Sequence, residues 1–182
     1  MVSDSAQDVL DFWFSELKPK QWWVKDTQLD QQIATRFGHV HQQAHNGALK
    51  HWRTTPSGRL AEIIVLDQFS RNIFREKPQA FACDEMALLL AREAVEKGAD
   101  QPLPVQQRAF MYMPFMHSES LDAHKQALTL FAQPGLEANL ASEHKHLAIL
   151  QRFGRYPHRN KILGRESTAE ETEFLTQPGS SF

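Results

Sequence analysis

The chain has 182 residues, of which 41% are hydrophobic and 23% charged, and its formal net charge is −2. These values are typical of a globular protein with a sizeable core. We therefore expect one domain over residues 1–182, with a core at about 5–176 and a loose tail at 177–182. Because nucleic acids and anionic membranes favour a basic surface, this charge gives no support to binding either of them.

The cellular compartment is indicated by cysteine content and by the lack of long apolar runs. Cys83 is the single cysteine, which excludes an intramolecular disulfide and favours a reducing compartment. No apolar stretch is long enough to cross a membrane, and the first residues lack the layout of a signal peptide. We expect a soluble, cytoplasmic protein.

The predicted elements are helices along the whole chain, because apolar residues recur at helical spacing and no alternating run indicates a strand. In chain order we expect helices over 5–17, 27–45, a buried run at 60–74, 84–97, 104–113, 119–132 and 136–152. Short helices should begin at Pro157 and Thr168, and Pro114 should end the helix before it. Short loops between them predict an all-α fold of about 8–9 helices, arranged as antiparallel hairpins in a bundle or solenoid.

Two charges lie on the most apolar of these helices. Residues 60–74 are apolar almost all the way round, yet Asp67 and Arg71 lie one turn apart within the apolar face. A buried charge is costly unless it is paired and hydrogen-bonded. The pair is therefore either a structural ion pair or part of a binding or catalytic site.

A second polar segment, His117-Ser118-Glu119, follows an apolar run that Pro114 interrupts. Ser118 or Ser120 fits a helix cap and Glu119 suits the positive end of a helix dipole, so capping is one complete explanation of Ser118 and Glu119 and a functional site is the other. A lone histidine beside Met and Phe is more often a hydrogen-bonded core residue than a ligand. His117 therefore has a structural interpretation as well as a functional one.

The helix expected over 136–152 carries two histidines, His144 and His146. His146 projects between Leu150 and Phe153, so we expect it to be at least half buried. Side chains two positions apart point about 200° from each other on a helix. The two rings therefore cannot bind the same metal ion, because two histidines of one helix need i,i+4 spacing to chelate a metal.

The third polar segment runs from Arg152 to Arg165 and contains four arginines in 14 residues. Pro157 sets a new helix start, whose free N–H groups attract anions. The polar side chains around that start are Arg155, His158, Arg159 and Asn160. They predict an anion-binding surface. The alternative is that the arginines pair with Asp67, Glu119 and helix C-termini as internal ion pairs.

Four segments of the chain carry a resemblance to a protein family: DFWF (11–14), LDQFSRNIFR (66–75), MPFMHSE (113–119) and FGRYPHRNKILGRESTAEE (153–171). In these segments and in their order, the chain resembles domain-of-unknown-function family 924, over about residues 8–176. The resemblance implies an all-α fold similar to tetratricopeptide-repeat proteins, with helical hairpins wound into a compact superhelix. It implies no established activity.

The family's motifs group the candidate residues into three polar blocks. The first block is Asp67, Gln68, Arg71, Asn72 and Arg75. The second is His117, Ser118 and Glu119, and the third is His146, Arg155, His158, Arg159, Asn160 and Arg165. The chain departs from the family at Ser70, where Pro is usual, and at His124, where Gln is expected.

One interpretation of the blocks is a site for a small anionic molecule. The arginines would hold a carboxylate or phosphate, and a histidine would move protons near neutral pH. The candidate catalytic residues are His117, Glu119, His146 and His158. The other members of the blocks are candidate ligand-binding residues, and Asp67 is a further candidate to orient a histidine. No phosphate loop, dinucleotide fingerprint or nucleophile elbow indicates a reaction. Whether the protein is an enzyme stays open, and we expect no cofactor.

Other interpretations compete with the anion site. The groove of a superhelix could bind a peptide or partner protein through the exposed members of Trp13, Trp22, Trp23 and Trp52. The blocks could also form a salt-bridge core without a cavity. A metal site using His117, Glu119, His146 or His158 is a further alternative, although no metal signature is present. We favour the small-molecule site, which predicts that the three blocks converge on one pocket.

Overall fold

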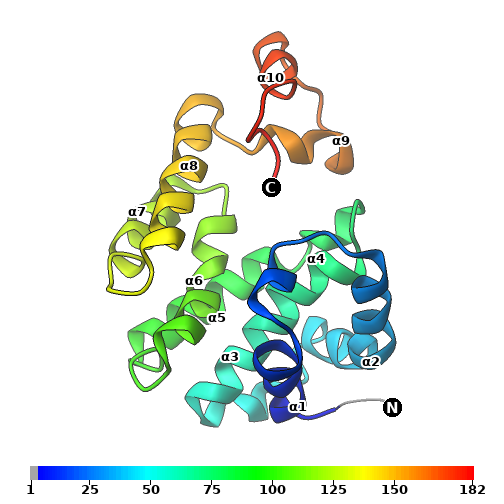
Figure 1. The fold of residues 1–182 in the computed structure, drawn as a ribbon, viewed down its shortest axis with the longest axis vertical. Coiled ribbons are helices and arrows are strands. Elements are labelled where there is room, and N and C mark those ends of the chain that lie inside the picture. Colours follow the sequence, from blue (N-terminus) through cyan, green and yellow to red (C-terminus); the bar gives the residue numbers. More distant parts are fainter. Residues whose placement is uncertain (1–3) are drawn as a thin grey trace.

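The computed structural model describes residues 4–182. Within that range it contains helices and turns and no strand, which confirms the all-α prediction. The α-helices are α1 (Ala6–Asp11), α2 (Thr27–His45), α3 (Pro56–Ile64), α4 (Ser70–Ile73), α5 (Asp84–Glu96), α6 (Val105–His117), α7 (Leu121–Leu130), α8 (Glu137–Phe153), α9 (Asn160–Leu163) and α10 (Ala169–Phe174) (Figure 1). None of the helices in these residues has the length and hydropathy needed to span a membrane.

The N-terminal half packs α1 against α3 and α2 against α4. Aromatic rings fill the space between these helices, with Phe37 at 5.1 Å from Phe12 and at 4.9 Å from Phe69, between ring centroids. Trp13 lies edge-on to Phe110 of α6 at 5.5 Å. This apolar cluster fixes α6 against the N-terminal half, and so fixes the place where α6 ends.

Helices α3 and α4 form one continuous helix through a π-helical turn at Val65–Phe69. The turn lies where the chain is most deeply buried, and it contains Asp67 and Gln68. A π turn adds a residue to the helical repeat and shifts the side chains that follow, and such turns are frequent at functional sites. Here the turn holds a buried carboxylate inside an apolar helix.

Helix α6 continues through Pro114 to His117, which differs from the predicted stop. Proline inside a helix removes one backbone hydrogen bond and costs about 3 kcal/mol. The residues on both sides of Pro114, from Met111 to Met116, are all exposed by 3% or less. Their burial outweighs the lost bond, so the helix carries His117 into the centre of the molecule.

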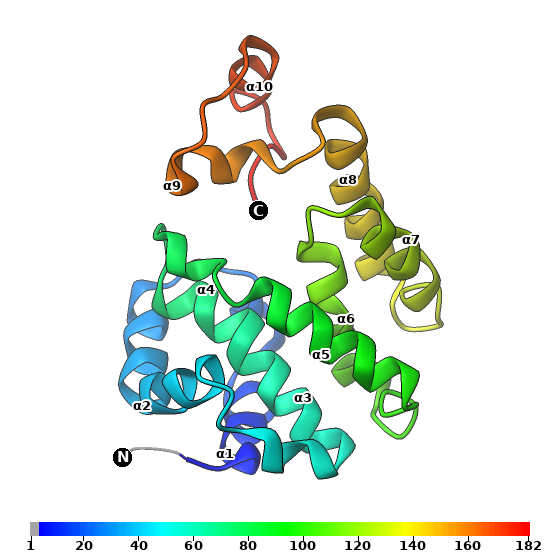
Figure 2. The ribbon, with the colours of Figure 1, turned by 180° about the vertical axis from the view of Figure 1, so that it is seen from behind.

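The C-terminal region leads from the end of α8 to α9 and α10, which lie on the side of the molecule where α4 ends (Figures 1 and 2). Helix α8 ends at Gly154, whose φ of 73° suits glycine, and α9 and α10 follow. The sequence predicts a loose tail over 177–182, whereas in the structure the chain turns back to the centre. Ser180 is only 6% exposed, and the ring of Phe182 lies 3.9 Å from that of His146.

Candidate functional site

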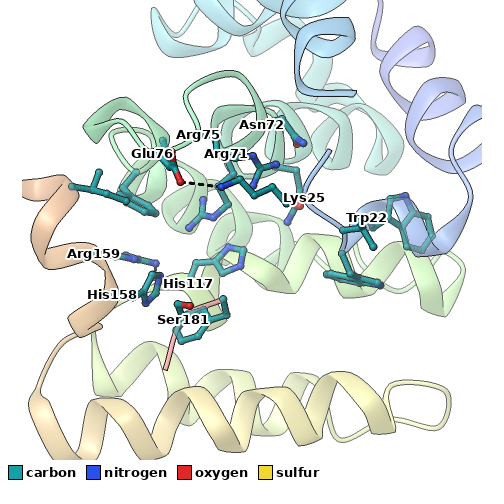
Figure 3. Close-up of a pocket in the computed structure, with 17 residues that line it drawn as sticks. Trp22, Lys25, Arg71, Asn72, Arg75, Glu76, His117, His158, Arg159 and Ser181 are labelled. Atoms are coloured by element: carbon teal, nitrogen blue, oxygen red, sulfur yellow. Dashed lines mark hydrogen bonds and ion pairs between the residues drawn. The ribbon is translucent and has the colours of Figure 1, made fainter. Parts of the chain in front are cut away.

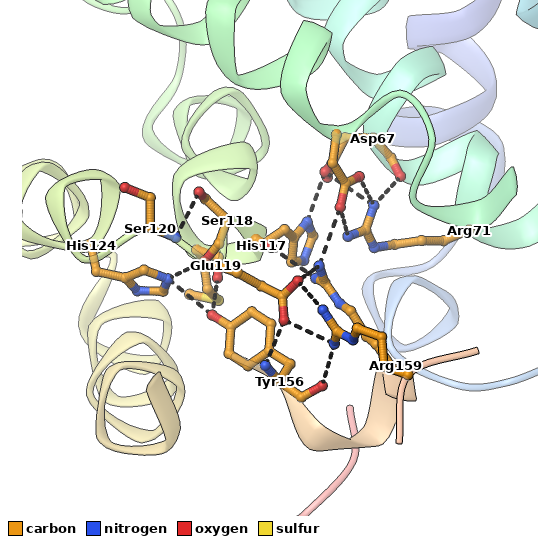
Figure 4. A network of polar contacts seen from close by, with 12 residues as sticks. Asp67, Arg71, His117, Ser118, Glu119, Ser120, His124, Tyr156 and Arg159 are labelled. Carbon is orange, nitrogen blue, oxygen red and sulfur yellow. Dashed lines mark hydrogen bonds and ion pairs between the residues drawn. The ribbon is translucent and has the colours of Figure 1, made fainter. Parts of the chain in front are cut away.

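The first and second polar blocks meet at Asp67. Its carboxylate, which is fully buried, lies 2.7 Å from Nδ1 of His117 and accepts bonds from Arg71 at 3.3 Å and from Gln68 at 2.9 Å (Figure 4). Burial by itself would raise the pKa of Asp67, but the charges of His117 and Arg71 outweigh it and the pKa is lowered. Asp67 is therefore a carboxylate that accepts from the His117 ring.

This contact orients His117. Because the carboxylate accepts, Nδ1 carries the proton and Nε2 keeps its lone pair. Burial lowers the pKa of His117, the charge of Arg71 lowers it further, and Asp67 opposes both. The ring is neutral near pH 7 and is suited to accept a proton at Nε2.

Arg71 connects Asp67 to a second carboxylate, that of Asp84. Its guanidinium donates two hydrogen bonds to Asp84, at 2.8 and 3.0 Å, and one to the backbone carbonyl of Asp67. Burial would lower the pKa of Arg71, but the charges of Asp84 and Asp67 raise it. Arg71 is therefore a fixed positive charge with most of its donors already used.

Arg159, from the third block, is held differently. It is 4% exposed, yet it donates one hydrogen bond, from Nη2 to the backbone carbonyl of His117 at 2.8 Å. Its nearest carboxylates, Asp84 and Glu119, lie 3.7 and 4.0 Å from Nη1, and its Nε is buried without a partner. Burial lowers the pKa of Arg159, and the neighbouring Arg71 charge lowers it further. Arg159 is thus a buried cation with unused donors.

A cavity of about 510 Å³ opens beside these groups, and we call it the cationic cavity (Figure 3). The basic side chains that line it are Lys25, Arg71, Arg75 and Arg159. Among the described residues, Glu76 is the one acidic side chain in the lining, and it pairs with Lys25 at 2.9 Å. Aromatic side chains complete the wall, namely Trp22, Trp23, Phe81 and Phe182. The cavity is therefore positively charged and partly aromatic.

His158 lines the same cavity beside Arg159. Its Nδ1 is buried and has no hydrogen-bond partner. Burial, followed by the charge of Arg159, lowers its pKa to about 3. The ring of Phe182 covers His158 at 4.3 Å between centroids. His158 is therefore a neutral side chain of the cavity wall whose Nδ1 is buried and unpaired.

Gln68, Asn72 and Arg75 of the first block also line the cationic cavity. Asn72 and Arg75 both donate to Asp30 of α2, with Arg75 making two bonds at 2.6 and 2.8 Å. These bonds fix α4 against α2. The two side chains border the cavity, but their main contacts are structural.

The other two members of the second block face a different side of the molecule. Ser118 and Glu119 line another cavity, of about 630 Å³, whose lining also includes His117 and Arg159. Glu119 accepts two bonds from Arg165, at 2.9 and 3.1 Å, and one from the backbone N–H of Tyr156. Ser118 accepts from the backbone N–H of Ser120, which is itself the N-cap residue of α7 and makes no side-chain capping bond, so the capping interpretation of Ser118 finds no support. Glu119 therefore anchors the C-terminal segment.

Four residues of the third block lie outside the cationic cavity, and three of them, Arg155, Asn160 and Arg165, are bound to other side chains of the protein. Arg155 donates two bonds to Glu171, at 2.8 and 2.9 Å, Asn160 donates to Glu171, and Arg165 pairs with Glu119. The helix expected at Pro157 is a short 3-10 turn followed by the four-residue α9. A helix this short has almost no dipole with which to attract an anion. The ligand-binding role predicted for Arg155, Asn160 and Arg165 has no support here, because carboxylates of the protein use their donors.

The sequence of the whole chain identifies its relatives. The profile of a bacterial family of unknown function, DUF924, matches residues 9–179. The chain belongs to the DUF924 family. A solved structure of a protein of unknown function from Agrobacterium tumefaciens is similar, with a TM-score of 0.89 and 38% sequence identity, over 93% of this chain and 96% of that one. No curated protein matches the chain.

His146 of the DUF924 chain lies apart from the cationic cavity, on α8. Its Nδ1 donates to the backbone carbonyl of Ser142 at 2.7 Å, and burial lowers its pKa to about 4. The Phe182 ring lies between His146 and His158, since it contacts both. His146 borders a second cavity, which shares His117 with the first.

Several residues of the DUF924 site were not predicted. In the sequence Asp84 is an ordinary residue for a helix start, and Lys25 is an ordinary surface charge. No local pattern therefore indicates that either one belongs to a site. The buried group of His124, Glu143 and Tyr156 is also new. Nδ1 of His124 contacts the Glu143 carboxyl, and Nε2 lies 2.7 Å from the carbonyl of Ser118 and 2.9 Å from the hydroxyl of Tyr156. The departure from the family at His124 is the one signal that pointed there.

The metal alternative finds no support in the geometry. Within residues 4–182, no three side chains of His, Cys, Asp or Glu are grouped closely enough to hold a metal ion. His117, Glu119, His146 and His158 instead face different partners.

Proposed function

We propose that this DUF924 protein binds a small organic anion in the cationic cavity, between Arg159 and His117. The main support for this proposal is the environment of Arg159. A buried guanidinium is expected to use its N–H donors on carboxylates or carbonyls, and Arg75, Arg155 and Arg165 each do so with two bonds to one carboxylate. Arg159 is as deeply buried as any arginine of the site and is left with a bare Nε.

An anion in the cavity would interact with two cations at once. It would accept hydrogen bonds from Arg159 and neutralise part of the charge of Arg71. Charge-assisted hydrogen bonds of this kind contribute about 1.5–3 kcal/mol each. The basic excess of the lining favours a carboxylate or phosphate over a neutral ligand.

His117 gives the site a group for acid–base chemistry. Its Nδ1 is held by Asp67, and Nε2 is left for a ligand or water in the cavity. An aspartate that fixes the tautomer of a histidine is the arrangement by which many enzymes prepare a general base. His117 is therefore the residue that we assign to proton transfer with the bound anion.

The proposal is tested by calorimetric titration with phosphate, acetate and succinate at low salt. Replacing Arg159 with Gln should weaken binding by about tenfold or more, because one charge-assisted contact is lost. Arg159→Lys should restore part of the affinity, since it keeps the charge without the planar fork. Lys161→Gln is the matched control, because Lys161 is exposed on the neighbouring α9 and lines none of the cavities described here. Equal affinities for the wild type and Arg159→Gln would reject the site.

A further inference from the structure

A second cavity of about 500 Å³ lies between α6 and α8, and we call it the apolar groove. Its floor is formed by successive turns of α6, at Ala109, Phe110, Met113 and Met116, all exposed by 5% or less. Among the described residues no charged side chain lines the groove, although histidine and amide side chains do. Its chemistry is thus opposite to that of the cationic cavity.

The groove is lined along its length by α6 and α8, which begin near the same end of it. At one end Gly135, just before α8, packs on Val105 at the start of α6. At the other end His117 closes α6 and His146 lies on the facing side of α8. From Gln106 to His117 the groove follows α6 for about 16 Å, at about 1.5 Å per residue. This length suits an extended chain better than a compact group.

The apolar groove and the cationic cavity lie next to each other. They share His117, Trp22 and Trp23 in their linings. Trp22 is fixed, because its indole N–H donates to the carbonyl of Trp13 at 2.9 Å and its ring lies edge-on to Phe110 at 4.9 Å. Trp23 stacks on Phe110 at 5.8 Å but is still 59% exposed. These two rings form a wall that passes from one compartment to the other.

From this shared lining we propose that the ligand is an amphipathic acid that occupies both cavities. Its anionic group lies in the cationic cavity beside Arg159, and its unbranched apolar chain lies in the apolar groove along α6. The proposal rests on the proposed function and specifies the class of molecule bound there. His117 lines both cavities, so it would lie beside the ligand's carbon atom that carries the anionic group.

The size of the effect distinguishes this class from simple anions. Burying a methylene changes affinity by about threefold to fourfold. A chain that fills the groove should therefore bind about a hundredfold more tightly, or better, than the same anionic group without a chain. It should also reduce the exposure of Trp23 and shift its fluorescence.

The experiment compares acetate, octanoate and dodecanoate by calorimetry and tryptophan fluorescence. Ala138→Trp should fill the groove, because Ala138 is an exposed α8 residue of its lining. Ala141→Trp is the matched control, with the same change at an exposed α8 position outside the lining. We expect affinity to rise with chain length in the wild type and in Ala141→Trp, while in Ala138→Trp the rise is lost and acetate binding is kept.

The possible outcomes separate the two proposals. If acetate and octanoate bind equally to the wild type, the amphipathic ligand is rejected and the anion site stands. A rise with chain length that persists in Ala138→Trp also rejects it, because the chain then lies elsewhere. If no acid binds and phosphate does not either, both proposals fail. Octanoate binding that survives Arg159→Gln unchanged would remove the anion site while leaving an apolar one.

Discussion

Asp67 and His117 are 50 positions apart in the chain, and a hydrogen bond of 2.7 Å joins them. The bond connects the π turn between α3 and α4 to the last residue of α6. Because Asp67 is fully buried and also held by Arg71 and Gln68, it has little freedom to move. His117 therefore presents Nε2 to the cavity in one orientation, which is the basis of the proton-transfer role proposed for it.

Asp67→Asn tests this relationship. The amide keeps the shape of the side chain but removes the charge that Arg71 and His117 face, so we expect a loss of about 3 kcal/mol in the free energy of unfolding. Urea denaturation measures it, and Asp122→Asn, at an exposed surface pair, is the control with almost no expected change. Nitrogen chemical shifts of the His117 ring should also show a mixture of tautomers. A ring that keeps its proton on Nδ1 in the variant would contradict the orienting role.

Stability should fall in mild acid because of His146 and His158. Their pKa values in the folded protein are about 4 and about 3, below the ordinary value of 6.5. As the pH falls below about 6.5 the unfolded chain takes up protons that the folded protein does not, so stability present at pH 7 is lost toward pH 4. We expect a loss on the order of 1 kcal/mol per histidine by pH 5. In His146→Gln the pH dependence, measured by urea denaturation, should be shallower.

Arg155 and Glu171 should affect stability without affecting anion binding. Their paired hydrogen bonds hold the C-terminal segment, and the bond to Arg155, together with backbone and Asn160 bonds, lowers the pKa of Glu171 to about 2. Arg155→Gln should therefore lower the free energy of unfolding, measured by urea denaturation. Calorimetry with phosphate should give the wild-type affinity, and a large loss of affinity would return Arg155 to the site.

The buried pair of His124 and Glu143 should be strongly coupled. Burial raises the pKa of Glu143; its Oε1 contacts Nδ1 of His124, and its Oε2 is buried without a hydrogen-bond partner. Either single change to Gln leaves a buried polar group poorly matched, at a cost of about 2–4 kcal/mol. The double variant should cost less than the sum by about 1 kcal/mol or more in a double-mutant cycle. Simple additivity would mean that the contact contributes nothing.

Phe182→Ala should open the edge of the cationic cavity. The Phe182 ring covers both His146 and His158, at 3.9 and 4.3 Å. Without it water reaches both rings, so their pKa values should move upward toward 6.5. Proton NMR of the ring signals measures the shift, with Leu89→Ala, at a 65% exposed position, as the control. Unchanged pKa values would show that other groups shield these histidines.

The sequence by itself determined the helices and the unusual position of Asp67 and Arg71. Helical spacing, glycine stops and capping residues act within a few positions, so they can be read locally. The same is true of the apolar run that buries the pair. The extension of α6 through Pro114 was not predicted. The local rule that proline ends a helix was overridden there, because the rest of the molecule buries the residues around Pro114.

Only the tertiary structure decided which charges meet. The sequence indicated four arginines between Arg152 and Arg165, but not that Arg155 is satisfied by Glu171 and Arg165 by Glu119 while Arg159 is left with free donors. Pairing depends on distances set by the packing of helices far apart in the chain, and the positions of the charges along the chain do not encode those distances. Composition fixes how many charges there are, and packing fixes which of them remain for a ligand.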